Sequence, residues 1–346
     1  LIVVFALLAG LLLSLSARAA IFAPAELVLE EGTGAAAFTV ALAAPADATV
    51  QVAVAGSAVP GEDFTLSATS LVFTLAGPRQ QSVQVEALRD GAVEGPERAA
   101  LRLVRPDSAA AETGAPLQLV VRDADSLLVM SANLTSGRYQ QYEAPGVRLF
   151  QALRPDVVAV QEFTPAAGTR RAFVDAAFGT GFAFHVESEA SDNIPNGIIS
   201  RWPIIASGEW TDLVVPNRDF AWATVALPGG RRLHVVSLPL YASGSPRQRA
   251  EQGQSVVAYA RRQFPAGDFI VVAGDLNAKE RGEPVLAALG ELVSDAHQPV
   301  DPQGDPDTNV ARSKPLDYVL PDPQLDALHR PLPFLGGLYP EGLVFD

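Results

Sequence analysis

The pattern of hydrophobic and polar positions changes once along the chain, near residue 125. Before that point, apolar and polar residues alternate in short runs that are separated by turn residues such as Glu31-Gly32 and Asp90-Gly91. Alternation with a period of two is typical of half-buried strands. It predicts seven strands, over 27–30, 36–42, 50–55, 70–75, 82–87, 99–104 and 117–122. Short, evenly spaced strands without a helical period between them predict an all-β antiparallel sandwich over residues 20–125.

After residue 125 the apolar runs become more continuous, and two stretches have helical spacing. We expect strands over 127–131, 156–160, 182–186, 197–200, 220–226, 233–237 and 269–273, and helices over 146–153 and 246–262. Strand pairs with occasional helices between them favour α+β layers over a regular βαβ repeat. We therefore expect an α+β domain over residues 126–346.

The first residues have the pattern of a targeting segment. Residues 1–13 are almost entirely apolar, and Ala17-Arg18-Ala19 has the small-x-small form of a cleavage site. We predict a signal peptide over residues 1–19. An uncleaved anchor is the alternative, although the apolar run is short for a membrane span. The expected protein is exported to a periplasmic, secreted or cell-surface location, with no membrane span after cleavage.

Composition narrows the possible chemistry. The chain has 346 residues with 48% hydrophobic and 18% charged residues, which indicates a globular protein. It contains no cysteine, which excludes disulfides and thiolate metal sites. Its net charge of −14 argues against a broad basic surface for nucleic acid. A polyanionic substrate would therefore need cations or a small local site.

The most informative stretch is the apolar run 269–273, which ends in Gly274-Asp275-Leu276-Asn277. Residues two apart in an extended chain point the same way, so Asp275 and Asn277 are expected to project together from a buried strand. A carboxylate beside an amide suits a hard divalent cation, or a phosphate and its attacking water. The alternative is an Asx-rich turn without chemistry.

Two other strand ends carry the same type of side chain. Asn133 follows Met130-Ser131-Ala132, and Glu162 follows Val160-Gln161. Apolar strands usually end in mixed turn residues, so three oxygen-bearing strand ends in one domain are unlikely to be coincidental.

With these residues the second region resembles the endonuclease/exonuclease/phosphatase (deoxyribonuclease I-like) superfamily. The similarity covers residues 126–346 and rests on five motifs in family order: Ser131-Ala132-Asn133, Val160-Gln161-Glu162, Asn196-Gly197-Ile198-Ile199-Ser200-Arg201-Trp202-Pro203, Gly274-Asp275-Leu276-Asn277 and Pro315-Leu316-Asp317-Tyr318-Val319-Leu320. The resemblance implies a four-layered αββα sandwich with the site at one end of the packed sheets.

The resemblance also implies roles for individual residues. Glu162 would be the principal ligand of Mg²⁺ (or Mn²⁺), with Asn133 beside it. Asp275 and Asn277 would orient the attacking water and contact the scissile phosphate. Asp317 would orient a catalytic histidine, and Asn196 would bind substrate.

The implied function is a nuclease-like phosphodiesterase that is assisted by a metal ion. Nucleic acid is the first candidate substrate, and a phospholipid or a small diester is the alternative. No feature of the sequence indicates an oligomeric state.

The chain departs from the family pattern at two places. Pro239 stands where the family's Thr-His-Leu-like motif has a histidine, and His234, five positions earlier, would point to the opposite face of the strand. The family's final Ser-Asp-His motif is absent before Asp346. We expect a sequence incomplete at both ends. The alternative is a degenerate protein that keeps the fold as a non-catalytic extracellular binding or adhesion module.

Some other polar residues allow two interpretations. Ser188 and Ser191 predict an exposed loop around Glu187 and Glu189, one of which could assist the site. Arg218 and Asp219 precede a strand and either lie near the site or form a surface ion pair. His185 is expected to be structural, and His297 has little claim to catalysis because it precedes Asp317.

The first region resembles a Calx-beta domain. The similarity rests on Glu30-Glu31-Gly32, Pro60-Gly61-Glu62-Asp63-Phe64, and Arg89-Asp90-Gly91 with Glu94-Gly95-Pro96-Glu97. In that family, acidic loop residues at one end of the sandwich can bind Ca²⁺. The matching positions are Glu31, Asp63, Asp90, Glu94 and Asp123. The alternative is a spacer whose acids only solvate turns.

Overall fold

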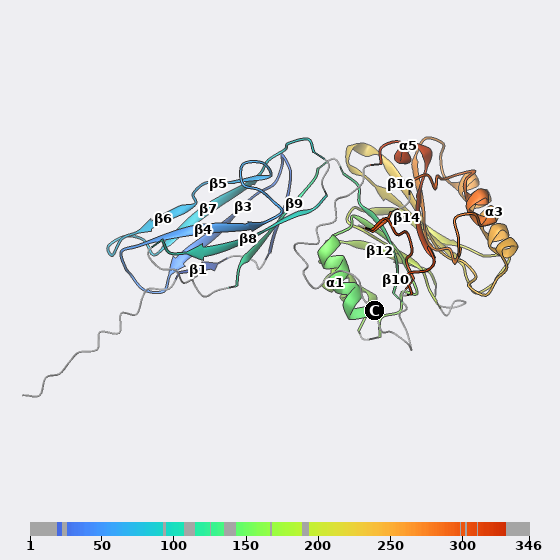
Figure 1. Cartoon of the computed structure of the whole chain (residues 1–346), viewed down its shortest axis with the longest axis horizontal. Helices are drawn as coiled ribbons and strands as arrows, with labels where there is room; N and C mark the ends of the chain where they lie inside the picture. The colour runs from blue at the N-terminus through green and yellow to red at the C-terminus, as the bar shows by residue number, and fades with distance from the viewer. Residues whose placement is uncertain are drawn as a thin grey trace, which may run out of the picture. The chain divides into compact units, whose positions relative to one another are not determined.

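A computed structural model gives the fold of the chain. It describes residues 19–22, 26–92, 95–106, 115–124, 126–134, 143–166, 168–188, 194–297, 299–301, 303–309 and 311–329. Two compact units, Leu1–Asp125 and Ser126–Asp346, make up the chain (Figure 1). Apart from Ala19, the expected signal peptide lies outside the described residues.

The first unit consists of two sheets around one core. One sheet has the order β1 (Ala19–Phe22), β3 (Ala35–Leu42), β7 (Gln80–Ala87), β5 (Phe64–Leu66). The other has the order β2 (Glu26–Glu30), β9 (Leu117–Arg122), β8 (Glu97–Val104), β4 (Ala48–Gly56), β6 (Ser70–Phe73). Alternate residues such as Phe38, Val83, Val50 and Leu101 are fully or almost fully buried in the core, as the period of two predicts.

One pairing differs from the expected antiparallel sandwich, since β2 pairs with β9 in parallel. These are strands from opposite ends of the unit, so their parallel pairing needs no tight hairpin. As a result both strands lead to the same end of the sheet. There the Glu31 amide donates to the Arg122 carbonyl oxygen at 3.0 Å, directly beside Asp123.

The second unit contains two more sheets. One has the order β10 (Val129–Asn133), β11 (Val157–Gln161), β13 (Gly197–Ser200), β12 (Ala183–Val186). The other has the order β14 (Ile204–Trp210), β15 (Phe220–Ala226), β16 (Arg232–Pro239), β17 (Phe269–Asp275), β18 (Asp317–Pro321). The pairs β10–β11 and β16–β17 are parallel, whereas the other strand pairs in these two sheets are antiparallel.

Three apolar clusters account for the arrangement of this unit. Val157, Ala159, Val235 and Val271 belong to a cluster that joins residues of both sheets. A second cluster joins β11 and β13 to the helices α1 (Glu143–Leu153) and α2 (Arg170–Phe178). A third joins β16 and β17 to α3 (Pro246–Gln263) and α4 (Pro284–Leu289), and Figure 1 shows α3 beside this sheet. Alternation therefore sends successive residues of β16 to different cores.

Several elements were absent from the sequence prediction. They are β1, β5, α2, β14, α4, β18 and the short helix α5 (Pro323–Asp326). Most are short, and β14 has the pattern Ile-Ile-Ala-Ser-Gly-Glu-Trp, which lacks clear alternation. No helix in the described part of the chain has the length and apolar character needed to cross a membrane.

Candidate active site

Four strand ends of the second unit bring the predicted site residues together. Asn133 is the last residue of β10, and Glu162 directly follows β11, its parallel partner. Asp275 is the last residue of β17, and it lies directly opposite Asp317, the first residue of the antiparallel strand β18. The carboxyl ends of neighbouring parallel strands lie at one edge of a sheet, which explains this convergence.

Asn133 links the two sheets at this edge. Its side-chain nitrogen Nδ2 donates to Glu162 Oε1 at 3.4 Å and to Asp275 Oδ2 at 3.3 Å. Each bond is long, but together they hold the two carboxylates on either side of a single amide. The predicted grouping of Asn133, Glu162 and Asp275 is therefore present as a hydrogen-bonded set.

A series of hydrogen bonds between polar side chains lies next to this set. Ser131 Oγ donates to Gln161 Oε1 at 3.4 Å, and Gln161 Nε2 donates to Ser237 Oγ at 2.9 Å. Ser237 Oγ in turn donates to the Val160 carbonyl oxygen at 3.0 Å. Since Gln161 and Ser237 are fully buried, these bonds fix the register of one sheet against the other next to Glu162.

The backbone from Asp275 to Asn277 forms a turn, whereas the sequence prediction assumed an extended chain there. Asn277 has a φ of 49°, and its backbone N–H donates to Asp275 Oδ1 at 3.0 Å, which is an Asx turn. The Asn277 side chain donates from Nδ2 to the Leu240 carbonyl oxygen at 2.9 Å. At Gly274, with φ 149°, an added Cβ would lie 2.1 Å from the Leu238 carbonyl oxygen. Close packing against β16 therefore requires glycine here.

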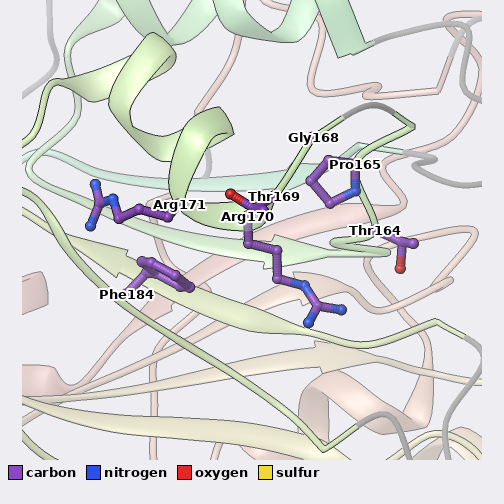
Figure 2. Close-up of a pocket in the computed structure, with 7 residues that line it drawn as sticks. All are labelled: Thr164, Pro165, Gly168, Thr169, Arg170, Arg171 and Phe184. Atoms are coloured by element: carbon purple, nitrogen blue, oxygen red, sulfur yellow. The ribbon is translucent and has the colours of Figure 1, made fainter.

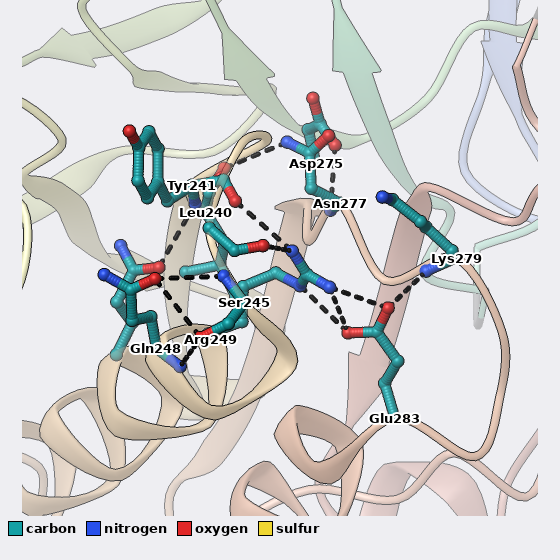
Figure 3. Close-up of polar contacts among 11 residues, drawn as sticks. Leu240, Tyr241, Ser245, Gln248, Arg249, Asp275, Asn277, Lys279 and Glu283 are labelled. Atoms are coloured by element: carbon teal, nitrogen blue, oxygen red, sulfur yellow. Dashed lines mark hydrogen bonds and ion pairs between the residues drawn. The ribbon is translucent and has the colours of Figure 1, made fainter.

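A buried ion pair holds the segments around Asn277 (Figure 3). Arg249 of α3 donates from Nη2 to Glu283 Oε1 at 2.8 Å and from Nε to Glu283 Oε2 at 2.9 Å, and both side chains are at most 5% exposed. Arg249 Nη1 donates to the Gly244 carbonyl oxygen at 2.7 Å, and Glu283 Oε1 accepts from the Lys279 amide at 2.9 Å. The pair thus connects the turn after Leu240 with the loop after Asn277. Neither Arg249 nor Glu283 was singled out from the sequence, since such pairs leave no local motif.

The carboxylates of the site have altered acidity. Burial raises the pKa of Asp275, and the nearby Glu162 carboxylate raises it further, while bonds from Asn277 and Asn133 and the Arg218 charge oppose the shift. Burial and the charge of Asp275 raise the pKa of Asp317 to about 7. Asp317 Oδ2 accepts from Thr308 Oγ1 at 2.8 Å, whereas its Oδ1 is buried and has no hydrogen-bond partner among the described residues.

Arg218 supplies the positive charge that lowers the pKa of Asp275. Its guanidinium lies over the Tyr241 ring, 6.0 Å from the centroid. Asp219 is buried and accepts from the Asp212 amide at 2.9 Å, and Gln252 donates to Asp212 while accepting from the Tyr241 amide at 3.1 Å. The sequence allowed Arg218 and Asp219 either to lie near the site or to form a surface ion pair. Arg218 lies near the site, and Asp219 belongs to a buried hydrogen-bond network instead of a surface pair.

Asn196 and Glu187 form a buried pair beside β15. The Asn196 backbone amide and Nδ2 both donate to Glu187 Oε2, at 2.9 and 3.0 Å, and Nδ2 also reaches the Asp219 carbonyl oxygen at 3.3 Å. The expectation of an exposed loop is wrong for Glu187, which is 3% exposed, because Asn196 compensates its burial. Glu189 lies outside the described residues. A substrate role for Asn196 stays a prediction.

His185, His234 and His297 bond to residues other than Asn133, Glu162, Asp275 and Asp317. Pro239 is directly opposite Asp275, so no imidazole occupies that position. His234 contacts Thr224 at 2.9 Å and Asp268 at 3.0 Å, near the other end of β16. His185 contacts the Gly208 carbonyl oxygen at 3.2 Å, and the exposed His297 contacts Asp326 at 2.8 Å.

The donor set fits a hard cation better than a soft one. The described residues contain no group of three or more His, Cys, Asp or Glu side chains arranged to hold a metal ion. The carboxylates of Glu162 and Asp275 share one amide, and their repulsion contributes to the raised pKa of Asp275. A cation would relieve this repulsion, and carboxylate and amide oxygens suit Mg²⁺ or Mn²⁺.

The acidic loops of the first unit also converge. Burial is the main cause that raises the pKa of Glu31 to about 7, and the charges of Asp123, Asp90 and Asp63 add to it. Asp63 and Asp123 are buried and accept backbone N–H groups of Val59 and Gly95, at 2.6 and 3.0 Å. Glu94 lies outside the described residues. Calcium binding here stays a prediction.

Comparison with models of known protein families shows which family the chain belongs to. The model of the endonuclease/exonuclease/phosphatase family matches residues 147–337. The chain belongs to this family. The Calx-beta domain model matches residues 17–129, so both resemblances seen in the sequence are confirmed. No curated protein matches the chain.

Several solved structures are similar to part of the chain. A mannosyl-6-phosphatase of Bacteroides thetaiotaomicron is 15% identical, with 57% of this chain and 86% of that chain covered and a TM-score of 0.45. The beta toxin of Staphylococcus aureus, in a β-hairpin deletion mutant, is 18% identical, with 57% and 87% covered and a TM-score of 0.44. The catalytic domain of human Nocturnin is 18% identical, with 57% and 82% covered and a TM-score of 0.46.

Proposed function

We propose that the chain is an exported, metal-dependent phosphoesterase that hydrolyses phosphodiester bonds by attack of water. Family membership supports the coarser statement that it acts on phosphoester bonds. The observation that carries the proposal is the set of strand ends in which Asn133 bonds both Glu162 and Asp275, with Asp317 directly opposite Asp275. The proposed scaffold is a four-layered αββα sandwich.

In the proposed mechanism Glu162 and Asn133 would hold the divalent cation. When bound, Mg²⁺ would supply positive charge to the phosphate oxygens, where charge develops during attack. Arg218, close enough to lower the pKa of Asp275, adds a fixed positive charge beside the same carboxylate. Asn277 positions the phosphate and the water, since its own backbone is fixed by the Asx turn.

Proton transfer is assigned to the carboxyl groups of Asp275 and Asp317, which lie directly opposite each other on β17 and β18. The pKa of Asp275 is raised, which makes its carboxylate a better acceptor for a proton of the attacking water. Asp317, with a pKa near 7, would take up or release a proton at its buried Oδ1. In this scheme Asp275 would accept a proton from the attacking water as the new phosphorus–oxygen bond forms, and protonated Asp317 would return a proton to the leaving oxygen as its bond to phosphorus breaks.

The first unit is proposed to bind Ca²⁺ through Glu31, Asp63, Asp90, Glu94 and Asp123. The raised pKa of Glu31 supports this, because it reflects carboxylates that repel one another in a buried loop cluster. Export is proposed because residues 1–19 have the pattern of a signal peptide. The Calx-beta match supports an extracytoplasmic protein.

A second candidate function is a non-catalytic binding module. It is favoured by Pro239, which places a residue without a titratable group opposite Asp275. The two candidates make different predictions for turnover, because a binding module would not hydrolyse any phosphodiester at a rate above background.

The test is a phosphodiesterase assay on the full chain with Mg²⁺, with Mn²⁺ and with chelator. Single-stranded DNA, RNA, sphingomyelin and bis(p-nitrophenyl) phosphate cover the substrate classes. We expect metal-dependent turnover of at least one. Absence of turnover on all four, with a protein that is folded by circular dichroism, would support the binding module instead.

A further inference from the structure

Gln252 of α3 is a polar side chain that the proposed mechanism does not use. It is fully buried, and both ends of its amide make hydrogen bonds. Its Oε1 accepts from the Tyr241 amide at 3.1 Å, and its Nε2 donates to Asp212 Oδ2. Tyr241 directly follows Leu240, whose carbonyl oxygen accepts the Asn277 side chain. Gln252 therefore connects α3 with two segments beside the proposed site.

The loop between β14 and β15 carries Arg218 and is closed at its base by Asp212. The Asp212 amide donates to Asp219 Oδ1 at 2.9 Å, and Asp212 Oδ1 accepts from the Val214 amide at 2.8 Å. Asp212 is only 1% exposed. Burial raises the pKa of its carboxyl group, while bonds from the Val214 amide and from Gln252 oppose this shift. The Gln252 bond thus compensates part of the cost of burying a carboxylate at the base of the loop.

The helix α3 holds Tyr241 through both of its backbone polar groups. Gln252 accepts its amide, and Arg249 Nη1 donates to its carbonyl oxygen at 3.4 Å. Gln252 and Arg249 are three positions apart, so they lie on the same face of the helix, and both are at most 1% exposed. The helix therefore fixes the backbone of Tyr241, whose ring lies under the Arg218 guanidinium.

Arg218 is available to an anion, in contrast to two arginines that line a cavity of the same unit. Arg170 and Arg171 line a cavity of about 480 Å³ at the start of α2 (Figure 2). Arg170 Nε donates to the Phe163 carbonyl oxygen at 2.8 Å, and Arg171 pairs with Asp175 at 2.6 Å. The Arg218 guanidinium has its ring contact but no hydrogen bond or ion pair with the described residues. It can therefore meet an anion without giving up an internal bond.

We propose that Gln252 is a positioning residue for phosphate recognition, and that it acts on Arg218. It does so by two routes, because it holds Asp212 at the base of the loop and Tyr241 under the guanidinium. The ligand is the phosphate group of the substrate, which Arg218 meets beside Asp275, whereas Gln252 does not touch it. A planar guanidinium binds phosphate well only in the correct orientation, which gives the helix its influence. This inference rests on the proposed function.

The test measures how strongly inorganic phosphate competes with a phosphodiester substrate. Gln252→Met keeps the approximate side-chain volume and removes both bonds, so it should raise the inhibition constant for phosphate about tenfold, as Arg218→Gln should. Because Gln252 acts through Arg218, the double variant should bind phosphate no more than about twofold more weakly than Arg218→Gln alone. Additive losses would indicate a merely structural role. Such additivity, or an unchanged constant in Gln252→Met, would overturn the proposal.

A reversed hydrogen bond keeps the test decisive if Gln252→Met folds poorly. Gln252→Glu places a second carboxyl group against Asp212, and adding Asp212→Asn restores a hydrogen bond that runs in the opposite direction. The combined variant should bring the inhibition constant back to within about threefold of the wild-type value, whereas Gln252→Glu alone should not. A combined variant that folds but does not recover phosphate inhibition would contradict the proposal.

The matched control is Gln151→Met on α1. Gln151 Nε2 donates to the Ala176 carbonyl oxygen of α2 at 2.9 Å, so the same substitution removes a glutamine bond elsewhere in the second unit. This variant should have the wild-type inhibition constant for phosphate. A tenfold rise in Gln151→Met as well would show that the effect is not specific to Gln252.

Chemical labelling distinguishes failure of the positioning role from failure of hydrolysis. Phenylglyoxal modifies accessible arginines, and peptide mass spectrometry follows Arg218 by itself. Without divalent metal, inorganic phosphate should protect Arg218 in the wild type and in Gln151→Met, and should protect it less in Gln252→Met. If this holds and the wild type hydrolyses nothing, the positioning role stands and the proposed function fails. If the wild type hydrolyses a phosphodiester and phosphate protects Arg218 equally in all three proteins, the positioning role is wrong.

Discussion

At the scale of single residues, the site has two features. One is the turn at Asn277, with its positive φ, and the other is the carboxylate of Asp275, whose repulsion by Glu162 is opposed by the charge of Arg218. Glu162, the proposed metal ligand, and Asn277, the proposed phosphate contact, both have positive φ, at 56° and 49°. Such backbone conformations are uncommon outside glycine and persist where the surrounding structure holds them. Asn277 is held by Asp275 and Leu240. The Asx turn that the sequence offered as an alternative is thus present, and a phosphate-binding role for Asn277 stays a prediction.

The first prediction concerns the titration of Asp317. Since burial and Asp275 raise its pKa to about 7, Asp317 takes up a proton as the pH falls through that value. The rate kcat/KM on a phosphodiester should show an ionisation near pH 7 in the wild type. Asp317→Asn should remove this ionisation and lower the rate about tenfold to a hundredfold.

The control for this variant is Asp295→Asn, an exposed residue outside the strand ends. It should keep both the profile and the rate. If Asp317→Asn retained the ionisation near pH 7, another group would have to be responsible and the assignment would be wrong.

At the scale of elements, the periodic segments were predictable and the irregular connections were not. The strands Leu117–Arg122, Gly197–Ser200 and Phe220–Ala226 have the predicted bounds, because they alternate or are continuously apolar between turn residues. α2 was missed because its sequence, Arg-Arg-Ala-Phe-Val-Asp-Ala-Ala-Phe, is short and has a broad apolar face. Its N-cap Thr169 was the available signal.

The same division applies to the site. Asn133, Glu162 and Asp275 were predictable because each stands at the end of an apolar strand or directly after it, whereas Asp317 followed only from the family resemblance because β18 was not predicted. The partners Arg249 and Glu283 were not, because their 34-residue separation is bridged only after α3 packs on the sheet. The exposed-loop prediction for Glu187 failed because a neighbouring serine says nothing about a buried partner such as Asn196.

The second prediction tests the buried ion pair Arg249–Glu283, which connects α3 with the loop after Asn277. Arg249→Met leaves Glu283 buried without its partner, which should lower the free energy of unfolding by about 3–5 kcal/mol. Arg247→Gln, in the exposed pair on the same helix, should cost less than about 1 kcal/mol. Urea unfolding followed by tryptophan fluorescence gives both values.

A double variant separates the charge from the packing. Arg249→Met combined with Glu283→Leu removes both buried charges, so it should recover part of the lost stability. It should not recover the turnover, because the turn after Leu240 and the Lys279 amide lose their anchors. Recovery of full turnover would contradict a positioning role for the pair.

At the scale of the whole molecule, the two units are proposed to use different cations for different purposes. The acids of the first unit are proposed to bind Ca²⁺, whereas those of the second unit are proposed to act on a phosphate. All three tryptophans lie at positions 202, 210 and 222, within the second unit. Tryptophan fluorescence therefore follows the second unit alone, while far-ultraviolet circular dichroism follows both.

The third prediction concerns the first unit. The raised pKa of Glu31 means that its stabilising contribution is present at low pH and is lost as the pH rises through about 7. Without Ca²⁺, the first unit should therefore melt at a lower temperature at pH 8 than at pH 5. Ca²⁺ should raise that melting temperature more at pH 8, where the carboxylates are ionised.

Glu31→Gln should weaken both effects, and Glu86→Gln, an exposed position on β7, should leave them unchanged. Neither variant should alter hydrolysis by the second unit. A melting temperature of the first unit that is insensitive to Ca²⁺ at pH 8 would favour a spacer domain.

The most direct test of the central claim is the Mg²⁺-dependent hydrolysis of a phosphodiester by the wild type, by Glu162→Gln and by Glu280→Gln. Glu280 is an exposed acid near Asn277 and serves as the matched control. The account predicts that Glu162→Gln lowers kcat/KM by about 10³-fold or more, with tryptophan fluorescence unchanged, and that Glu280→Gln keeps the wild-type rate. A folded Glu162→Gln protein that hydrolyses the substrate at the wild-type rate would contradict it.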